Sequence, residues 1–152
     1  MQTNSLIDNY KRMGHCPADT AGHETFRASD GVIRVRGEIN GILGVFIIDT
    51  GASYVTIDEA FAKKAGLSFQ NSWSGKAITP NGVIEGRFAT ARTITVGQTE
   101  AHNVTVMVDE RPLEQGLDDG LLGMSFLSRF DISLKPGQIQ ISARPTTTGS
   151  QH

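Results

Sequence analysis

The sequence predicts an all-β domain with one or two short helices, and three observations lead to this prediction. Glycine accounts for 17 of 152 residues, a share typical of proteins with many tight turns. Short apolar runs rich in Val and Ile recur between residues 31 and 141, several of them alternating with polar residues as half-buried strands do. Asn-Gly pairs or single glycines separate these runs, as in β-hairpins. We expect a polar extension at residues 1–28, one domain at residues 29–143 and a disordered tail at residues 144–152.

Charge and cysteine content exclude several classes of protein. The net charge is -2 and the pI is near 6.1, so the chain has no excess of positive charge with which to bind polyanions. Neither nucleic acid nor an anionic membrane is therefore an expected partner. The single Cys16 rules out a disulfide within the chain. No apolar run reaches the roughly 18 residues of a membrane-spanning helix, and the first 30 residues lack a signal peptide's apolar core. His15, Cys16 and His23 have no fourth ligand nearby, so neither a metal nor a cofactor is expected.

The first predicted element is a hairpin over residues 31–48. Apolar residues alternate with charged ones up to Ile39, and Asn40-Gly41 is a strong signal for a two-residue turn. The second strand ends in the apolar run 45–48 and delivers the carboxylate of Asp49 to a turn. A desolvated carboxylate costs several kcal/mol unless partners satisfy it. Gly51 permits a turn tight enough to bring backbone amides onto Asp49, and the Thr50 hydroxyl can donate and accept.

A short helix follows this turn. The string Thr56-Ile57-Asp58-Glu59 matches a capping box, in which Thr56 caps the helix and Glu59 reaches back to it. The helix is expected to continue through Phe61 and to stop at Gly66 in the left-handed conformation.

Two further strand pairs are predicted in the middle of the chain. Residues 76–89 indicate a hairpin with a compact tip at Asn81-Gly82, and residues 91–108 indicate a second pair with a turn at Gly97-Gln98. His102 is expected at that turn, facing solvent and without a catalytic role.

The last elements are a buried strand, a helix and a hairpin. Leu121 and Leu122 are expected to form the buried strand, and Gly123 to allow a close backbone approach. A helix over residues 124–130 follows, and the last hairpin, over residues 132–141, turns at residues 135–137.

Three features in this order resemble the retropepsin-like aspartic proteases, and their bacterial single-domain group in particular. They are the run Ile-Ile-Asp-Thr-Gly-Ala-Ser at residues 47–53, the hairpin at residues 76–89 and the run Leu-Leu-Gly-Met at residues 121–124. The resemblance covers residues 29–143. It implies a closed β-barrel of the acid-protease fold that is active as a homodimer, with Asp49 catalytic. The resemblance implies that the active-site loop is supported by Thr50, Gly51, Ala52 and Ser53. It implies a flap, the hairpin tip that covers bound peptide, formed by Thr79, Pro80, Asn81, Gly82 and Val83. It also implies that the cleft is supported by Leu121, Leu122 and Gly123.

The resemblance also implies an activity. One Asp49 cannot act as general acid and general base at once, so two subunits would bring their Asp49 residues together to share one proton and activate water. Peptides or proteins would be the substrates. In the family, the chain ends interleave into a sheet between subunits, and here the C-terminal strand pair or the N-terminal extension is expected to do so. Bacterial members of the family often carry a membrane anchor. Two locations for this chain are therefore left open: it is either the soluble domain of a membrane-anchored periplasmic protein or a cytoplasmic protein. The alternative function is a non-catalytic dimeric peptide-binding module on the same fold.

Overall fold

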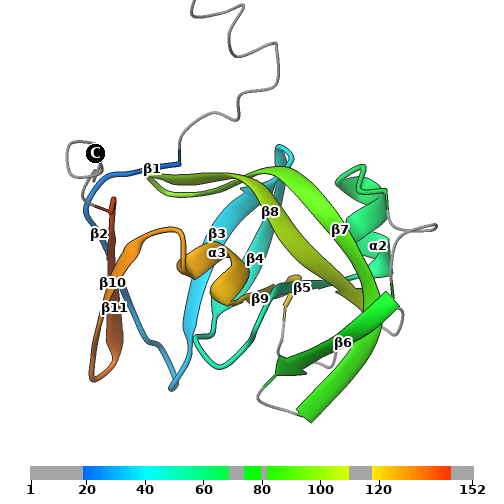
Figure 1. The fold of residues 1–152 in the computed structure, drawn as a ribbon. Coiled ribbons are helices and arrows are strands. Elements are labelled where there is room, and N and C mark those ends of the chain that lie inside the picture. The colour runs from blue at the N-terminus through cyan, green and yellow to red at the C-terminus, as the bar shows by residue number, and fades with distance from the viewer. Residues whose placement is uncertain (1–18, 69–73, 80–81, 110–117, 145–152) are drawn as a thin grey trace, which may run out of the picture.

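The structure is a computed structural model, and it describes residues 19–68, 74–79, 82–109 and 118–144. The described residues form a mostly β protein with two short helices (Figure 1). The strands are β1 (Thr20–Ala21), β2 (Glu24–Arg27), β3 (Ile33–Ile39), β4 (Ile42–Ile48), β5 (Val55–Asp58), β6 (Ser74–Thr79), β7 (Gly82–Val96), β8 (Thr99–Asp109), β9 (Gly120–Leu122), β10 (Asp131–Lys135) and β11 (Gln138–Ser142). The helices are α2 (Glu59–Lys64) and α3 (Met124–Leu127). Neither has the length and apolar character needed to cross a lipid bilayer.

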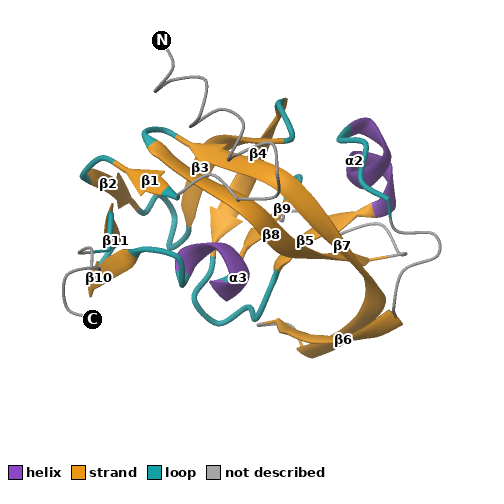
Figure 2. Cartoon of the chain, turned by 45° about the horizontal axis from the view of Figure 1, so that its top comes forward, coloured by secondary structure: helices purple, strands orange, loops and turns teal. Residues whose placement is uncertain are grey.

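The main sheet closes into a barrel. Its strands follow one another in the order β8, β5, β9, β4, β3 and β7, and β7 pairs again with β8 to complete the ring. The pairs β4–β9 and β5–β8 are parallel, whereas the other pairs in the ring are antiparallel. β6 extends the sheet from β7, and β1 adds to β8 (Figure 2). The prediction of an all-β closed barrel is confirmed.

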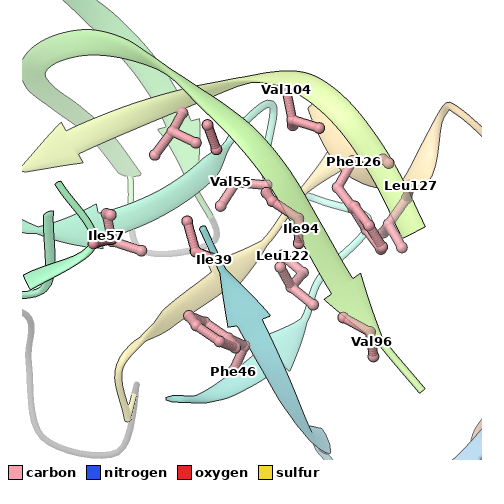
Figure 3. Close-up of a cluster of buried hydrophobic side chains, with 14 of the residues drawn as sticks. Ile39, Phe46, Val55, Ile57, Ile94, Val96, Val104, Leu122, Phe126 and Leu127 are labelled. Carbon is pink, nitrogen blue, oxygen red and sulfur yellow. The ribbon is translucent and has the colours of Figure 1, made fainter. Parts of the chain in front are cut away.

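The barrel is filled by apolar side chains from every strand of the ring. Many of them have no exposed surface, and Figure 3 shows how Phe46, Val55 and Ile94 project from different strands toward one another. The ring of Phe46 meets that of Phe61 on α2 edge to face, with centroids 5.6 Å apart. Burial of this apolar area contributes most of the favourable free energy of folding of the barrel, and it holds the strands on either side of Asp49 in place.

The first hairpin forms in the predicted register. Ile39 pairs with Ile42 across the turn, and Asn40 and Gly41 have φ values of 52° and 84°, which a two-residue hairpin turn requires. The Asn40 side chain adds contacts that the sequence did not predict. Its Oδ1 accepts from the Arg92 N–H (2.8 Å), and its Nδ2 donates to the carbonyl of Ala65 after α2 (3.0 Å). Asn40 therefore ties the turn to both β7 and the end of α2.

The predicted capping box was wrong, although the helix is present. Thr56 lies within β5, where it pairs with β8 and β9 and is buried. The N-cap of α2 is Asp58, whose Oδ1 accepts from the Phe61 N–H at 2.9 Å. Pairing on both sides keeps residues 55–58 extended, so the helix begins only after them. The left-handed stop at Gly66 is confirmed, with φ of 70°.

Two strands lie inside the range predicted as a polar extension. β1 pairs with β8, and β2 pairs with β11 to give a separate sheet in the order β10-β11-β2. The carboxylate of Asp19 accepts from the His102 N–H (2.8 Å) and from Arg129 (3.0 Å), which holds the start of this segment against β8. His15, Cys16 and the tail beyond residue 144 lie outside the described residues.

The sequence predicted His102 at a turn. The structure instead places it within β8. Its side chain is only 12% exposed, and Nε2 lies 3.0 Å from a carboxylate oxygen of Glu100. The last hairpin, β10–β11, is confirmed with its turn at Pro136-Gly137, whereas α3 ends at Leu127 and not at Phe130.

Candidate active site

Asp49 begins the loop that joins β4 to β5. Its N–H donates to the carbonyl of Leu122 on β9 (3.1 Å), and the Ala52 N–H donates to the carbonyl of Asp49 (3.2 Å). The Gly51 N–H donates to Oδ1 of Asp49 at 2.8 Å, which is the amide contact predicted from the sequence. Thr50 and Gly51 are exposed, while Asp49 is partly buried. The loop therefore fixes one carboxylate oxygen and presents the group near its exposed tip.

Gly123 supports this loop from the other side. A Cβ added at Gly123 would lie 2.6 Å from the carbonyl oxygen of Ala52 and 2.4 Å from that of Tyr54. Both neighbours are backbone atoms, which cannot rotate away. The Met124 N–H then donates to the Ala52 carbonyl (2.8 Å), and the Ser125 N–H donates to the Ser53 carbonyl (3.0 Å). The end of the loop thus packs against the backbone at the start of α3, and the two backbone segments are too close for a side chain to fit between them.

Ser125 is a further supporting residue, which the sequence did not indicate. Its Oγ accepts from the buried Val55 N–H on β5 (2.8 Å) and donates to the Thr105 carbonyl on β8 (2.7 Å). The hydroxyl joins α3 to two barrel strands at the point where the Asp49 loop returns to the sheet. No sequence pattern could have identified it, because both partners are distant in the chain.

We expect Ser125→Ala to lower the free energy of unfolding by about 1–3 kcal/mol, because a buried N–H loses its acceptor. Urea denaturation followed by circular dichroism measures this directly. Ser128→Ala, at an exposed position after the same helix, is the matched control and should change stability by less than about 0.5 kcal/mol. Equal stabilities of the two variants would show that the Ser125 contacts add nothing.

The turn before β9 is fastened to the first hairpin by two carboxylates. Asp119 exchanges two hydrogen bonds with Val45: its N–H donates to the Val45 carbonyl (2.9 Å), and its Oδ2 accepts from the Val45 N–H (2.9 Å). Asp118 pairs with Arg34 on β3, with Nε and Oδ2 2.8 Å apart. These contacts hold the start of β9, and therefore Leu121 and Leu122, in register with β4.

The predicted hairpin over residues 76–89 is present as β6 and the first part of β7. Thr79 pairs with Gly82, and Ile78 pairs with Val83. Pro80 and Asn81, which were predicted within the tip, lie outside the described residues. The side chain of Val83 is 62% exposed, although it is large and apolar. β7 continues past this hairpin as one strand to Val96, so the hairpin projects from the barrel wall (Figure 2).

An aromatic contact links this hairpin to the Asp49 loop. The ring of Tyr54, at the loop exit, lies edge to face against the ring of Phe88 on β7, with centroids 5.0 Å apart. Gly75 on β6 makes room for Phe88, because a Cβ there would lie 2.5 Å from the ring. The base of the hairpin is therefore packed against the residue that follows the active-site loop.

Beneath the loop lies a small apolar cluster, separate from the barrel core. It consists of Ile47, Ala52 and Leu121, with Val32 packed against them. Ile47 and Leu121 are register partners on β4 and β9, so both point to the face of the sheet that lies away from Phe46. The loop that carries Asp49 is thus backed by buried apolar side chains. Within the described part of the chain, no three His, Cys, Asp or Glu side chains gather as metal ligands would.

Comparisons with known proteins agree with this arrangement. The profile of a family described as Aspartyl protease matches residues 35–126, more than half of the chain. Among solved structures, the chain is similar to a retropepsin-like aspartic protease from Rickettsia conorii, with 23% sequence identity and a TM-score of 0.61. The alignment covers 83% of this chain and 94% of that one. The comparison with curated proteins found no match. The barrel is therefore the retropepsin-like fold, as the sequence predicted.

Proposed function

The chain belongs to the aspartyl protease family, and we propose that it is an aspartic endopeptidase that works as a homodimer. One observation carries the proposal: Asp49 stands partly buried at an exposed loop, with one oxygen held by the Gly51 amide. A single chain supplies one such Asp-Thr-Gly loop. Water activation with simultaneous polarisation of a carbonyl needs an acid and a base, so the loop is half of a site. A two-fold axis beside Asp49 supplies the other half.

In the dimer, the two Asp49 carboxylates share one proton, because two like charges so close cannot both remain ionised. The ionised member takes a proton from a water molecule lying between them. The water oxygen bonds to the peptide carbonyl carbon, and the protonated member gives its proton to the carbonyl oxygen. The resulting intermediate carries two hydroxyl groups on the former carbonyl carbon. It collapses when the first Asp49, now protonated, gives its proton to the peptide nitrogen, the second Asp49, now ionised, takes a proton from one hydroxyl, and the C–N bond breaks. The products are a carboxylic acid and an amine, and the dyad returns to its starting state.

The neighbouring residues have supporting roles in this proposal. The Thr50 hydroxyl locks the two loops together across the axis, and Gly51, Ala52 and Ser53 hold the carboxylates in one plane. The hairpin of β6 and β7, with its tip at residues 79–83, closes over bound peptide and excludes water. The contact of Tyr54 with Phe88 supports this role, because it joins the base of the hairpin to the loop.

A preference for apolar side chains next to the cleaved bond accompanies the proposal. Ile47, Ala52 and Leu121 lie behind the Asp49 loop and are buried in the subunit, so the exposed apolar side chain that supports this preference is Val83 on the hairpin. Digestion of a mixed peptide library should therefore yield products whose new termini are mainly apolar residues. Cleavage chiefly next to charged residues would reject this preference.

We expect the activity per chain to fall on dilution, because each subunit contributes one Asp49 and the dimer dissociates at low concentration. The measurement pairs peptide cleavage with sedimentation across the same concentration series. Specific activity should follow the fraction of dimer. Activity that stays proportional to concentration well below the dimer dissociation constant would exclude a shared site. A dimer that cleaves nothing would favour the non-catalytic peptide-binding module.

A further inference from the structure

We propose that Arg34 selects substrates by binding an acidic side chain that lies about two or three residues from the cleaved bond. The inference rests on the proposed function and names a class of substrate for it. Arg34 is on β3, and its Nε donates to Oδ2 of Asp118 at 2.8 Å. The side chains of Arg34 and Asp118 are 39% and 31% exposed, so the pair stands at the surface and not inside the barrel.

The ion pair with Asp118 uses only one part of the Arg34 guanidinium. Arginine carries five N–H donors, and Asp118 accepts from the one on Nε. Within the part of the chain that the structure describes, no acceptor contacts the two terminal nitrogens. Asp119, the other carboxylate of this turn, accepts from the Val45 N–H instead. The terminal nitrogens can therefore donate in parallel to an incoming carboxylate, a geometry that arginine favours.

The contact with Asp118 also fixes the direction of this guanidinium. Asp118 has φ of 53°, a left-handed conformation that Asp tolerates better than most residues. The next residue exchanges two hydrogen bonds with Val45 on β4, so the turn is held to the sheet. A carboxylate anchored in this way restricts the rotamers of Arg34. Less side-chain entropy is then lost when a ligand binds.

The strand register places Arg34 on the face of the sheet that carries Asp49. Arg34 pairs with Ile47 on β4, and Asp49 follows Ile47 by two residues. Residues two apart along a strand face the same side, and the Asp49 N–H still bonds to the Leu122 carbonyl of β9. Arg34 and Asp49 are therefore diagonal neighbours, with a spacing of roughly 7–8 Å across an antiparallel pair.

This spacing sets the position of the selected side chain in the substrate. An extended peptide advances about 3.4 Å per residue, so a carboxylate at Arg34 belongs to a residue about two or three positions from the bond held at Asp49. The homodimer carries one Arg34 on each side of the cleaved bond, so acidic residues are favoured on both sides. Residues directly next to the bond remain apolar. The substrate class is thus a peptide with an apolar cleavage site flanked by acidic residues.

The first test measures binding in the absence of cleavage. The probes are fluorescein-labelled short peptides with an apolar pair at the centre, which differ only in Glu or Gln at the second or third position from the central bond. They are titrated with Asp49→Asn protein at concentrations where the dimer forms, and fluorescence anisotropy is recorded. We expect a Glu peptide to bind about fivefold more tightly than its Gln counterpart at one of these positions. Equal binding of every Glu and Gln pair, or no binding by any peptide, would overturn the inference.

The second test places substitutions of arginine in the Asp49→Asn protein. Arg34→Gln should abolish the preference for Glu. It also leaves Asp118 without its cation, so the double variant with Asp118→Asn, which keeps the net charge of the chain, should abolish the preference as well. Arg92→Gln is the matched control: Arg92 is exposed, and its backbone lies against Asn40 at the opposite end of the first hairpin from Asp49. It should keep the fivefold preference. A folded double variant that still prefers Glu would show that Arg34 does not bind the carboxylate.

Cleavage of the same peptides by protein with Asp49 intact separates this inference from the proposed function. The Glu peptide should have a kcat/KM about fivefold higher than the Gln peptide, chiefly through a lower KM, because the contact is made before the chemical step. Preferential binding of Glu peptides without any cleavage would refute the proposed function alone. Cleavage with equal kcat/KM and equal binding for the two peptides would refute the role of Arg34 alone. Circular dichroism of each variant establishes that the subunit is folded.

Discussion

Asp49→Asn is expected to reduce peptide cleavage by at least about a hundredfold, and by up to about 10⁴-fold. Asn nearly matches the shape of Asp and its Oδ1 can still accept from the Gly51 N–H, so the loop keeps its geometry. It cannot take a proton from water, and a dimer of this variant has neither the acid nor the base. The measurement is the initial rate on a mixed peptide library across acidic to neutral pH, at concentrations where the dimer forms.

Asp58→Asn is the matched control for this variant. Asp58 caps α2 through its side chain, and Asn is an equally good N-cap, so the variant should keep both fold and activity. Cleavage by purified Asp49→Asn at the wild-type rate would show that the activity comes from another site or another protein.

Gly123→Ala is expected to lower the free energy of unfolding by about 3 kcal/mol, and to reduce cleavage at temperatures where the protein remains folded. The added methyl group would stand 2.4 Å from the carbonyl oxygen of Tyr54 and 2.6 Å from that of Ala52, so backbone must move. Movement of Ala52 also disturbs the loop that holds Asp49, since the Ala52 N–H bonds to the Asp49 carbonyl. Stability is measured by urea denaturation and activity on the same samples.

Gly41→Ala separates the effect of crowding from that of removing a glycine. A Cβ at Gly41 would meet nothing within 4 Å, although its φ of 84° makes a side chain unfavourable. This variant should lose about 1 kcal/mol of stability and keep its activity. If Gly123→Ala proved no more harmful than Gly41→Ala, the close packing of β9 against the Asp49 loop would not be what supports the site.

The sequence predicts those parts of the fold whose signals are local. Asn40-Gly41 specifies its own turn, because both residues tolerate positive φ, and the alternation on either side sets the register. The amide contact within the Asp49 loop follows from a glycine two residues after the carboxylate. Leu121 and Leu122 are apolar in succession because β9 is buried on both faces between β4 and β5.

Features that depend on distant partners were not predictable from one sequence. Ser125 bonds to residues 70 and 20 positions away, and nothing near it in the chain indicates this. Thr56 begins an acceptable capping box, but pairing with β8 and β9 outweighs the local preference and moves the cap to Asp58. β2 has only four residues, with no clear apolar alternation, and is defined by β11 beside it.

The central claim is that two copies of Asp49 form one site, and mixing subunits tests it most directly. Asp49→Asn protein is added in increasing amounts to a fixed concentration of wild type, well above the dimer dissociation constant and with time for subunits to exchange. At equal amounts, random pairing places half of the wild-type chains in mixed dimers, so the cleavage rate should fall to about half and continue to fall with further addition. A rate that stays constant throughout the titration would show that one Asp49 suffices, and would contradict the shared site.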